Sequence, residues 1–186
     1  MMTADAIIAA MLVYLSPIVG DVHLDTKQIR CMADNAYFES ALESRIGKRQ
    51  VVYAVMDRIA SKHYPNTPCE VIWQKARDKR SGRVVSQFSW TWDGRVDKIK
   101  FTDKKGAVRP SVYRNYAMAV EEAVFVMLGL KDRPCEKTTT HYWSHIALKK
   151  PPYWHKDFHV ACRIGGHTFM TAKTARERSV AVATSD

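Results

Sequence analysis

Two consecutive amphipathic helix patterns constrain the fold of this chain more than any other feature. From Lys27 to about Tyr64, apolar residues recur three to five positions apart, and Gly47 interrupts the pattern. This spacing places apolar side chains on one face of a helix. We therefore expect two helices separated at Gly47, the second ending at the turn formed by residues 64–68. A further helix is expected from Pro110 to a stop at Gly129.

Residues typical of strands and turns occupy much of the remaining chain. Between Val84 and Phe101, β-branched and aromatic residues flank an Asp93-Gly94 turn, which predicts a hairpin or small sheet. Lys75 to Arg83 is expected to be a basic surface loop, and residues 163–169 a short β-like piece in an otherwise irregular region. No internal repeat or low-complexity linker appears, so we expect one α+β domain with a helical lobe and a small β lobe.

The composition indicates a folded basic protein. The 186 residues include 46% hydrophobic residues, enough to fill a core and to exclude a disordered or collagen-like chain. Lys and Arg number 29 against 19 Asp and Glu, for a net charge of +10. This charge indicates a polyanionic partner, either nucleic acid or an acidic polymer such as the cell wall.

The N-terminal segment 1–30 contains an uncharged, largely apolar stretch from Ile7 to Gly20. A membrane span needs roughly 20 apolar residues, and a secretory signal begins with a positive region, which MMTAD does not supply. Three alternatives stay open: a helix packed on the domain, a weak export signal, or a membrane tether. The polar tail 174–186 is expected to fray.

The four cysteines are too far apart to form a CxxC pair, which argues against a structural zinc finger. In an oxidising compartment they allow two disulfides with three connectivities, and in a reducing cytosol they would be buried thiols. Among the histidines, His155 and His159 lack an HExxH motif, so we expect no metal site. The cysteines are Cys31, Cys69, Cys135 and Cys162.

Glu39 and Glu43 are candidates for acid–base chemistry. They lie four residues apart on the first expected helix, which would project both carboxylates from one face. If that face is partly buried, the more enclosed carboxyl has a raised pKa and donates a proton near neutral pH, as glycosidic bond cleavage requires. The alternative is a solvated acidic face. The apolar and aromatic residues at 36–41 favour desolvation of one carboxyl.

Several short motifs follow one another in an order that resembles the SleB-type cell-wall hydrolases, a family of spore cortex-lytic enzymes and phage wall-degrading proteins. The resemblance extends from about Met32 to Met170. The sequence departs from the family pattern where Phe38 replaces a glycine, Ser40 an alanine and Asp57 an asparagine. The matching segments are AYFESALE (36–43), QVVYAVMDR (50–58), YPNTPCEVI (64–72), QFSW (87–90), THY (140–142), PYW (152–154) and IGGHTF (164–169).

The resemblance implies a lysozyme-like or transglycosylase-like catalytic domain at 31–173 that needs no cofactor. It implies cleavage of the β-1,4 bond between N-acetylmuramic acid and N-acetylglucosamine by a lytic transglycosylase. Glu39 matches the single catalytic acid, which would protonate the glycosidic oxygen and then accept the proton of the muramoyl C6 hydroxyl, giving a 1,6-anhydro product. A hydrolytic muramidase of the same fold is the alternative, and it would need a second carboxylate across the cleft.

Six further residues are predicted to bind substrate. Glu43 would orient substrate, tune Glu39, or only pair with Arg45 or Lys48. On a strand, the alternation of the QFSW segment would place its two polar side chains on one side, facing the sugars. The six predicted substrate-binding residues are Glu43, Gln87, Ser89, Thr140, His141 and Tyr142.

The expected partners are peptidoglycan glycan strands and the anionic wall surface. Nucleic acid is the alternative partner, bound through the basic segments 75–83 and 98–105, and a non-catalytic wall-binding protein is a third hypothesis. We expect a monomer, of phage or bacterial origin, that acts in the cell envelope, the periplasm or outside the cell. Membrane association would require the N-terminal segment.

Overall fold

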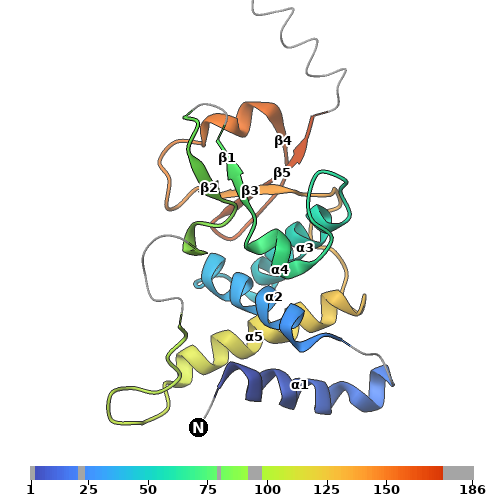
Figure 1. The fold of residues 1–186 in the computed structure, drawn as a ribbon, viewed down its shortest axis with the longest axis vertical. Helices are drawn as coiled ribbons and strands as arrows, with labels where there is room; N and C mark the ends of the chain where they lie inside the picture. Colours follow the sequence, from blue (N-terminus) through green and yellow to red (C-terminus); the bar gives the residue numbers. More distant parts are fainter. Residues whose placement is uncertain (1–2, 21–23, 79–80, 92–97, 174–186) are drawn as a thin grey trace, which may run out of the picture.

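The computed structural model describes residues 3–20, 24–78, 81–91 and 98–173. In Figure 1 the α-helices fill the lower and middle parts of the molecule, and the strands lie above them. This arrangement confirms the expected α+β class with a helical lobe and a small β lobe. The described elements are α1 (Ala4–Val19), α2 (Thr26–Glu39), α3 (Arg45–Ile59), α4 (Pro68–Ile72), β1 (Lys75–Arg77), β2 (Val84–Ser86), the 3-10 helix η1 (Ser89–Thr91), α5 (Pro110–Met127), β3 (His141–Ser144), the 3-10 helix η2 (Tyr153–Asp157), β4 (Phe158–Ile164) and β5 (His167–Ala172).

Helix α2 is the centre of the helical lobe, and it packs against α1, α3, α4 and α5. Ala33 and Ala36 of the predicted apolar stripe are fully buried and Tyr37 is half-buried, whereas Ala41 and Leu42 lie beyond the end of the helix and are exposed. The helix expected from Pro110 is also confirmed, because α5 ends at Met127 and Gly129 has a φ of +70°, which favours glycine. The core side chains of these two helices include Ile29, Met32, Ala33, Ala36, Tyr116, Val120, Ala123 and Val124.

The predicted break at Gly47 is wrong, because the chain leaves the helix earlier. Helix α2 ends at Glu39, and Ser40 follows with non-helical φ and ψ of −129° and 40°. Helix α3 begins after Ser44, whose hydroxyl oxygen accepts a hydrogen bond from the Gly47 amide. Side-chain capping of this kind ends and starts helices without a glycine. Gly47 serves close packing instead, since a Cβ there would lie 2.8 Å from Cβ of Glu43.

The β lobe contains a two-stranded and a three-stranded antiparallel sheet. The loop expected at 75–83 is wrong in part, because β1 and β2 pair across it and Gly82 turns the chain at φ +67°. The β-like piece at 163–169 is confirmed as the turn between β4 and β5. β3 lies in a region that was predicted to be irregular. It pairs with β5, which gives the three-stranded sheet the order β3-β5-β4. The expected Asp93-Gly94 turn lies outside the described residues.

Residues 87–90 do not form the expected strand. Ser89 to Thr91 form the 3-10 turn η1, in which the amide of Thr91 donates to the carbonyl of Phe88. Trp90 is buried in this turn, and its Nε1 donates to Oδ1 of Asn35 at 3.0 Å. Burial of this indole against α2 outweighs the strand preference of the local sequence.

Helix α1 covers α2 and α5 at the bottom of the molecule in Figure 1. It buries Ile7, Ile8 and Leu15, while Val13 and Tyr14 on its outer face are exposed. The structure thus gives this segment the form of a packed helix, and the export signal and the tether stay predictions. No helix within the described ranges combines the length and apolarity needed to cross a bilayer.

The four cysteines form two pairs, which selects one of the three connectivities. Cys31 pairs with Cys69, joining α2 to α4, and Cys135 pairs with Cys162, joining the segment after α5 to β4. The Cα–Cα distances of 5.3 and 5.7 Å lie within the range that disulfides span. The first bridge ties together the helical lobe, and the second holds the β lobe to the chain that leaves α5. The polar tail 174–186 lies outside the described residues.

Candidate active site

A cavity of about 470 Å³ lies between the ends of α2 and α3 and the β lobe. Its size is within the range of pockets that hold small ligands or parts of larger ones. Several elements contribute to its wall: α2 supplies Glu39, α3 supplies Arg58, and β3 supplies Tyr142. Further lining residues come from the segment around η1, from η2 and from β5. We call this cavity the cleft. Glu39 is the only Asp or Glu among the described residues that line it.

The Glu39 carboxyl has the electrostatic properties of a proton donor. Burial raises its pKa from 4.5 to about 7, because the charged form loses hydration. Two partners oppose this rise: the Tyr142 hydroxyl, which donates to Oε2 at 3.2 Å, and the positive charge of Arg58. Near neutral pH both protonation states are therefore well populated. A carboxyl in this condition can donate a proton in one step and accept one in the next.

Arg58 is the cation that faces this carboxyl. Its Nε donates to the carbonyl of Thr140 at 2.8 Å, and its guanidinium lies over the Phe88 ring at 4.7 Å. The residue is buried, and burial lowers its pKa. Its Nη1 is buried without a hydrogen-bond partner in the described part of the chain. Arg58 therefore adds a desolvated positive charge to the cleft, where it stabilises the anionic form of Glu39.

Our sequence reasoning did not single out Arg58 as a site residue, although a signal for it was present. Arg58 is the arginine that closes the 50–58 motif, and the substituted Asp57 precedes it. Asp57 accepts two hydrogen bonds from Arg133 and one from the amide of Thr139 at 2.6 Å. Asp57 therefore fixes the position of the segment that leads into β3. Its side chain is not among those that line the cleft.

The three residues of the 140–142 motif take different positions. Tyr142 reaches Glu39, and burial and the Glu39 charge raise the Tyr142 pKa well above its usual value. His141 packs against Phe158, with ring centroids 4.0 Å apart, and burial lowers its pKa to about 4. Thr140 shares a hydrogen bond with His141 through Oγ1. Of the three residues of this motif, only Tyr142 lines the cleft.

Glu43 does not share a helix face with Glu39, so that expectation is wrong. It lies in the loop between α2 and α3, because Ser40 has already ended α2. Its Oε1 accepts hydrogen bonds from the Gly166 amide at 2.8 Å and from Nδ1 of His167 at 3.2 Å. This carboxylate is thus fixed to the turn between β4 and β5. Its partner His167 lines the cleft, whereas Glu43 itself does not.

The basic residues expected to pair with Glu43 are mostly engaged elsewhere. Arg45 forms an ion pair with Glu121. Lys48 is buried, and its Nζ donates to the carbonyl of Ser40. Burial lowers the pKa of Lys48 to about 8, and the Glu43 charge opposes this shift. Lys48 therefore stabilises the backbone just after Glu39 while its charge faces Glu43.

Gln87 and Ser89 both line the cleft, although they lie on a turn rather than on a strand. The aromatic side chains of Trp143 and Trp154 line it as well. Trp154 also packs against His141, with ring centroids 5.2 Å apart. The cleft thus combines polar groups with indole rings, a surface suited to sugar hydroxyls and sugar faces.

One family profile and two solved structures match this chain. The profile of a family described as Cell Wall Hydrolase matches residues 42–170, which is more than half of the chain and begins just after Glu39. No curated protein matches the sequence. Two solved structures share the fold. The catalytic domain of the germination-specific lytic transglycosylase SleB from Bacillus anthracis has a TM-score of 0.51 and 20% identity, covering 80% of this chain and 97% of that one. The catalytic domain of the Bacillus cereus SleB protein has a TM-score of 0.50 and 19% identity, covering 82% of this chain and 95% of that one.

Proposed function

The chain belongs to the Cell Wall Hydrolase family, and from this membership we propose that it cleaves the glycan strands of peptidoglycan with Glu39 as its acid–base group. The observation that carries the proposal is the carboxyl of Glu39, the one Asp or Glu that the described residues place in the cleft, whose pKa burial raises to about 7. One of the two structures that share the fold is described as a lytic transglycosylase, and we extend that reaction to this chain.

The reaction follows from the two protonation states of Glu39. The protonated carboxyl donates its proton to the oxygen of the β-1,4 bond between N-acetylmuramic acid and N-acetylglucosamine as that bond breaks. Positive charge develops at the anomeric carbon of the muramoyl residue. The carboxylate then removes the proton from the muramoyl C6 hydroxyl, whose oxygen bonds to the anomeric carbon. Glu39 recovers its proton, and the products are a free 4-hydroxyl and a 1,6-anhydro end.

The number of carboxyl side chains in the cleft favours the transglycosylase reaction over hydrolysis. A two-carboxylate hydrolase places its second acid roughly 5 to 9.5 Å from the first, as a nucleophile or as the base for water. Within the described part of the chain, no second Asp or Glu lines the cleft, and Glu43 is bound to the β4–β5 turn. An intramolecular hydroxyl needs no such second acid, because Glu39 itself becomes the base.

The surrounding residues support roles in holding Glu39 and the sugars. Tyr142 and Arg58 favour the anionic form that must accept the second proton, and this keeps the pKa of Glu39 near neutrality. Gln87 and Ser89 offer hydrogen bonds to acetamido and hydroxyl groups, and Trp143 offers a ring for a sugar face. We place Glu43 outside direct contact with substrate, as a residue that positions the turn carrying His167.

We also propose where the protein acts. Two disulfides indicate an oxidising compartment, which fits the envelope, the periplasm or the outside of a cell. The net charge of +10 favours adsorption to an anionic wall. We propose that the monomer is the active species.

Analysis of released muropeptides tests this function. Purified protein is incubated with peptidoglycan, and the soluble products are identified by mass spectrometry. We expect 1,6-anhydromuramic ends, and we expect Glu39→Gln to lower turnover by about 100-fold or more. The matched control is Glu136→Gln, which removes an exposed carboxyl and should retain full activity. Reducing muramic ends would indicate a hydrolase, and wall binding without release would indicate a binding protein.

A further inference from the structure

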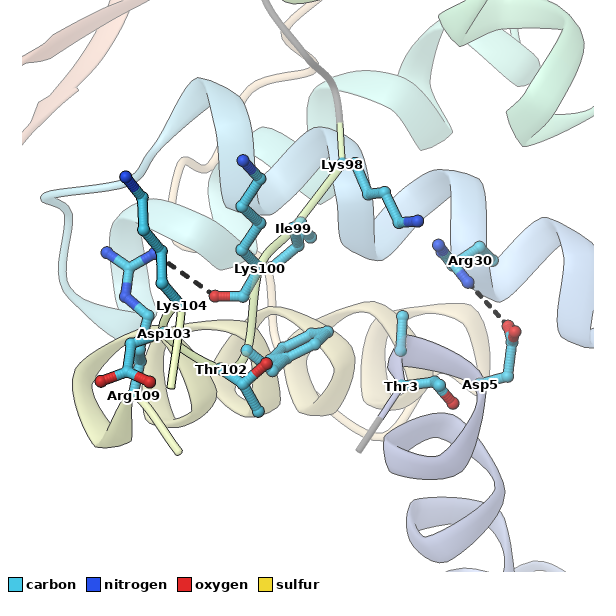
Figure 2. Close-up of a pocket in the computed structure, with 12 residues that line it drawn as sticks. Thr3, Asp5, Arg30, Lys98, Ile99, Lys100, Thr102, Asp103, Lys104 and Arg109 are labelled. Carbon is cyan, nitrogen blue, oxygen red and sulfur yellow. Dashed lines mark hydrogen bonds and ion pairs between the residues drawn. The ribbon is translucent and has the colours of Figure 1, made fainter. Parts of the chain in front are cut away.

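A second cavity, of about 750 Å³, lies on the helical lobe, and no described residue lines both this cavity and the cleft. Its wall consists of the start of α1, Arg30 of α2, residues 98–104 and Arg109 (Figure 2). Backbone hydrogen bonds hold this wall in place: the amide of Arg109 donates to the carbonyl of Phe101 at 2.8 Å, and Thr102 forms a β-bridge with Val108. The cavity is therefore shaped by ordered backbone. We call it the basic pocket.

The basic pocket carries an excess of positive charge. Among the residues that the structure describes, five cationic ones line it, against Asp5 and Asp103. Both acids already have partners. Asp5 forms an ion pair with Arg30 at 2.7 Å, and Asp103 accepts hydrogen bonds from the backbone amides of Lys105 and Ala107. The five cationic residues are Arg30, Lys98, Lys100, Lys104 and Arg109.

The three lysines of the pocket carry charge that no carboxylate neutralises within the described part of the chain. Lys98, Lys100 and Lys104 are exposed, and their ammonium groups form no ion pair within the described ranges. The pocket therefore presents uncompensated charge to a ligand from outside, and that ligand must be anionic.

The cations are distributed along the pocket rather than gathered at one point. In Figure 2, Lys98 extends toward Arg30 at one end, while Lys100 and Lys104 lie with Arg109 at the other. A site for one small anion would converge on a single position. Two separated groups of cations instead fit a linear ligand with repeated negative charges. The cavity volume agrees, because it exceeds the space that one phosphate or carboxylate fills.

The kind of anion follows from the side chains present. Lysine ammonium groups bind phosphate oxygens as point charges, and arginine binds phosphate through paired N–H donors, so both kinds of cation present here suit phosphodiester groups. Arg30 is already occupied by Asp5 and Asp34. Ile99, which is half-buried, adds apolar surface for a carbon backbone. The Phe101 ring is only 5% exposed, which leaves little ring face for the base stacking typical of single-stranded nucleic acid sites.

We propose that the basic pocket binds a polyol-phosphate polymer attached to the cell wall. This inference rests on the proposed function for the location of the enzyme, and it adds a second ligand at a separate site. Arg30 and Glu39 lie nine residues apart on α2, which corresponds to about 13 Å along the helix. A polymer anchored to the glycan strand therefore holds the cleft close to its substrate, and the effective concentration of glycan rises.

Binding of purified poly(glycerol phosphate) to the full chain tests the proposal. The dissociation constant is measured by titration calorimetry for the wild type and for K98A/K100A/K104A. We expect the variant to bind about 10- to 100-fold more weakly, since three exposed charge contacts are lost. The control K62A/K75A/K137A removes three exposed lysines outside the pocket and should change binding less than threefold. Equal weakening in both variants would refute the pocket, because net charge alone would then explain binding.

Two further arms separate the possible ligands. Walls stripped of phosphodiester polymer should bind wild type and pocket variant equally. A loss confined to the variant on stripped walls would mean that the pocket binds peptidoglycan carboxylates, and the proposal would fail. Tighter, pocket-dependent binding of a single-stranded oligonucleotide would overturn it in favour of nucleic acid. Turnover of short soluble glycans should be unchanged in the pocket variant, so failure of the pocket is distinguishable from failure of the active site.

Discussion

Replacing Glu39 with glutamine should change the pH dependence of stability in a direction that the structure dictates. The unfolded carboxyl ionises near pH 4.5, whereas the folded one does so near 7 because burial disfavours its charge. Between these values the folded state holds a proton that the unfolded state has lost, so wild-type stability falls as the pH rises through this window. At about 1.4 kcal/mol per pH unit, the destabilisation reaches about 3 kcal/mol above pH 7. Glutamine carries no charge at any pH and is free of this effect.

Urea denaturation followed by tryptophan fluorescence measures the difference directly. At pH 4 the free energies of unfolding of wild type and Glu39→Gln should be similar, because the carboxyl is protonated in both the folded and the unfolded wild type. At pH 8 the variant should be more stable by up to about 3 kcal/mol. Glu136→Gln, which removes an exposed carboxyl, corrects for the general effect of losing one acid. A difference between wild type and Glu39→Gln that stays constant from pH 4 to 8 would refute the raised pKa and, with it, the role of Glu39 as a donor near neutrality.

Three further outcomes are expected. Tyr142→Phe removes a hydrogen bond that lowers the Glu39 pKa, so the pH at which activity declines should move upward in a pH–rate profile; an unchanged profile contradicts this role. Glu43→Gln weakens the contacts that hold the β4–β5 turn and should cost about 1–2 kcal/mol of stability in urea, with less than a tenfold loss of turnover. Abolished turnover at full stability would instead place Glu43 in the reaction. Replacing both Cys31 and Cys69 with serine removes a disulfide that spans 38 residues and should lower the free energy of unfolding by up to about 4 kcal/mol. Reduction of the wild-type protein should also lower its free energy of unfolding. A double variant as stable as the oxidised wild type would contradict that pairing.

Features that depend on neighbouring residues were predictable from the sequence. The helix from Pro110 to Met127 follows from its apolar period and its glycine stop, both of which act over a few residues. The order of short motifs pointed to the cell-wall hydrolase family, and the family profile over residues 42–170 confirms it. Glu39 was selected for its motif and its apolar neighbours, and the structure buries this carboxyl beside the cleft.

Features that depend on distant residues were not predictable in the same way. The 3-10 turn at residues 89–91 replaces a strand because the Trp90 indole bonds to Asn35 on α2. β3 pairs with β5 across more than twenty residues, so the local pattern at 141–144 alone did not reveal the sheet. The choice among three disulfide connectivities likewise required the distances between elements.

The sequence by itself determined the main helices, the family and the identity of the candidate acid, because periodicity and motif order are properties of the chain. Only the tertiary structure decided that Glu39 and Glu43 are separated by the end of α2 and bound to different partners. It also decided that Arg58 and Tyr142, 84 positions apart, meet at one carboxyl. The physical reason is that the pKa of a carboxyl depends on the water it loses and the charges it meets, and both are set by segments that only folding brings together.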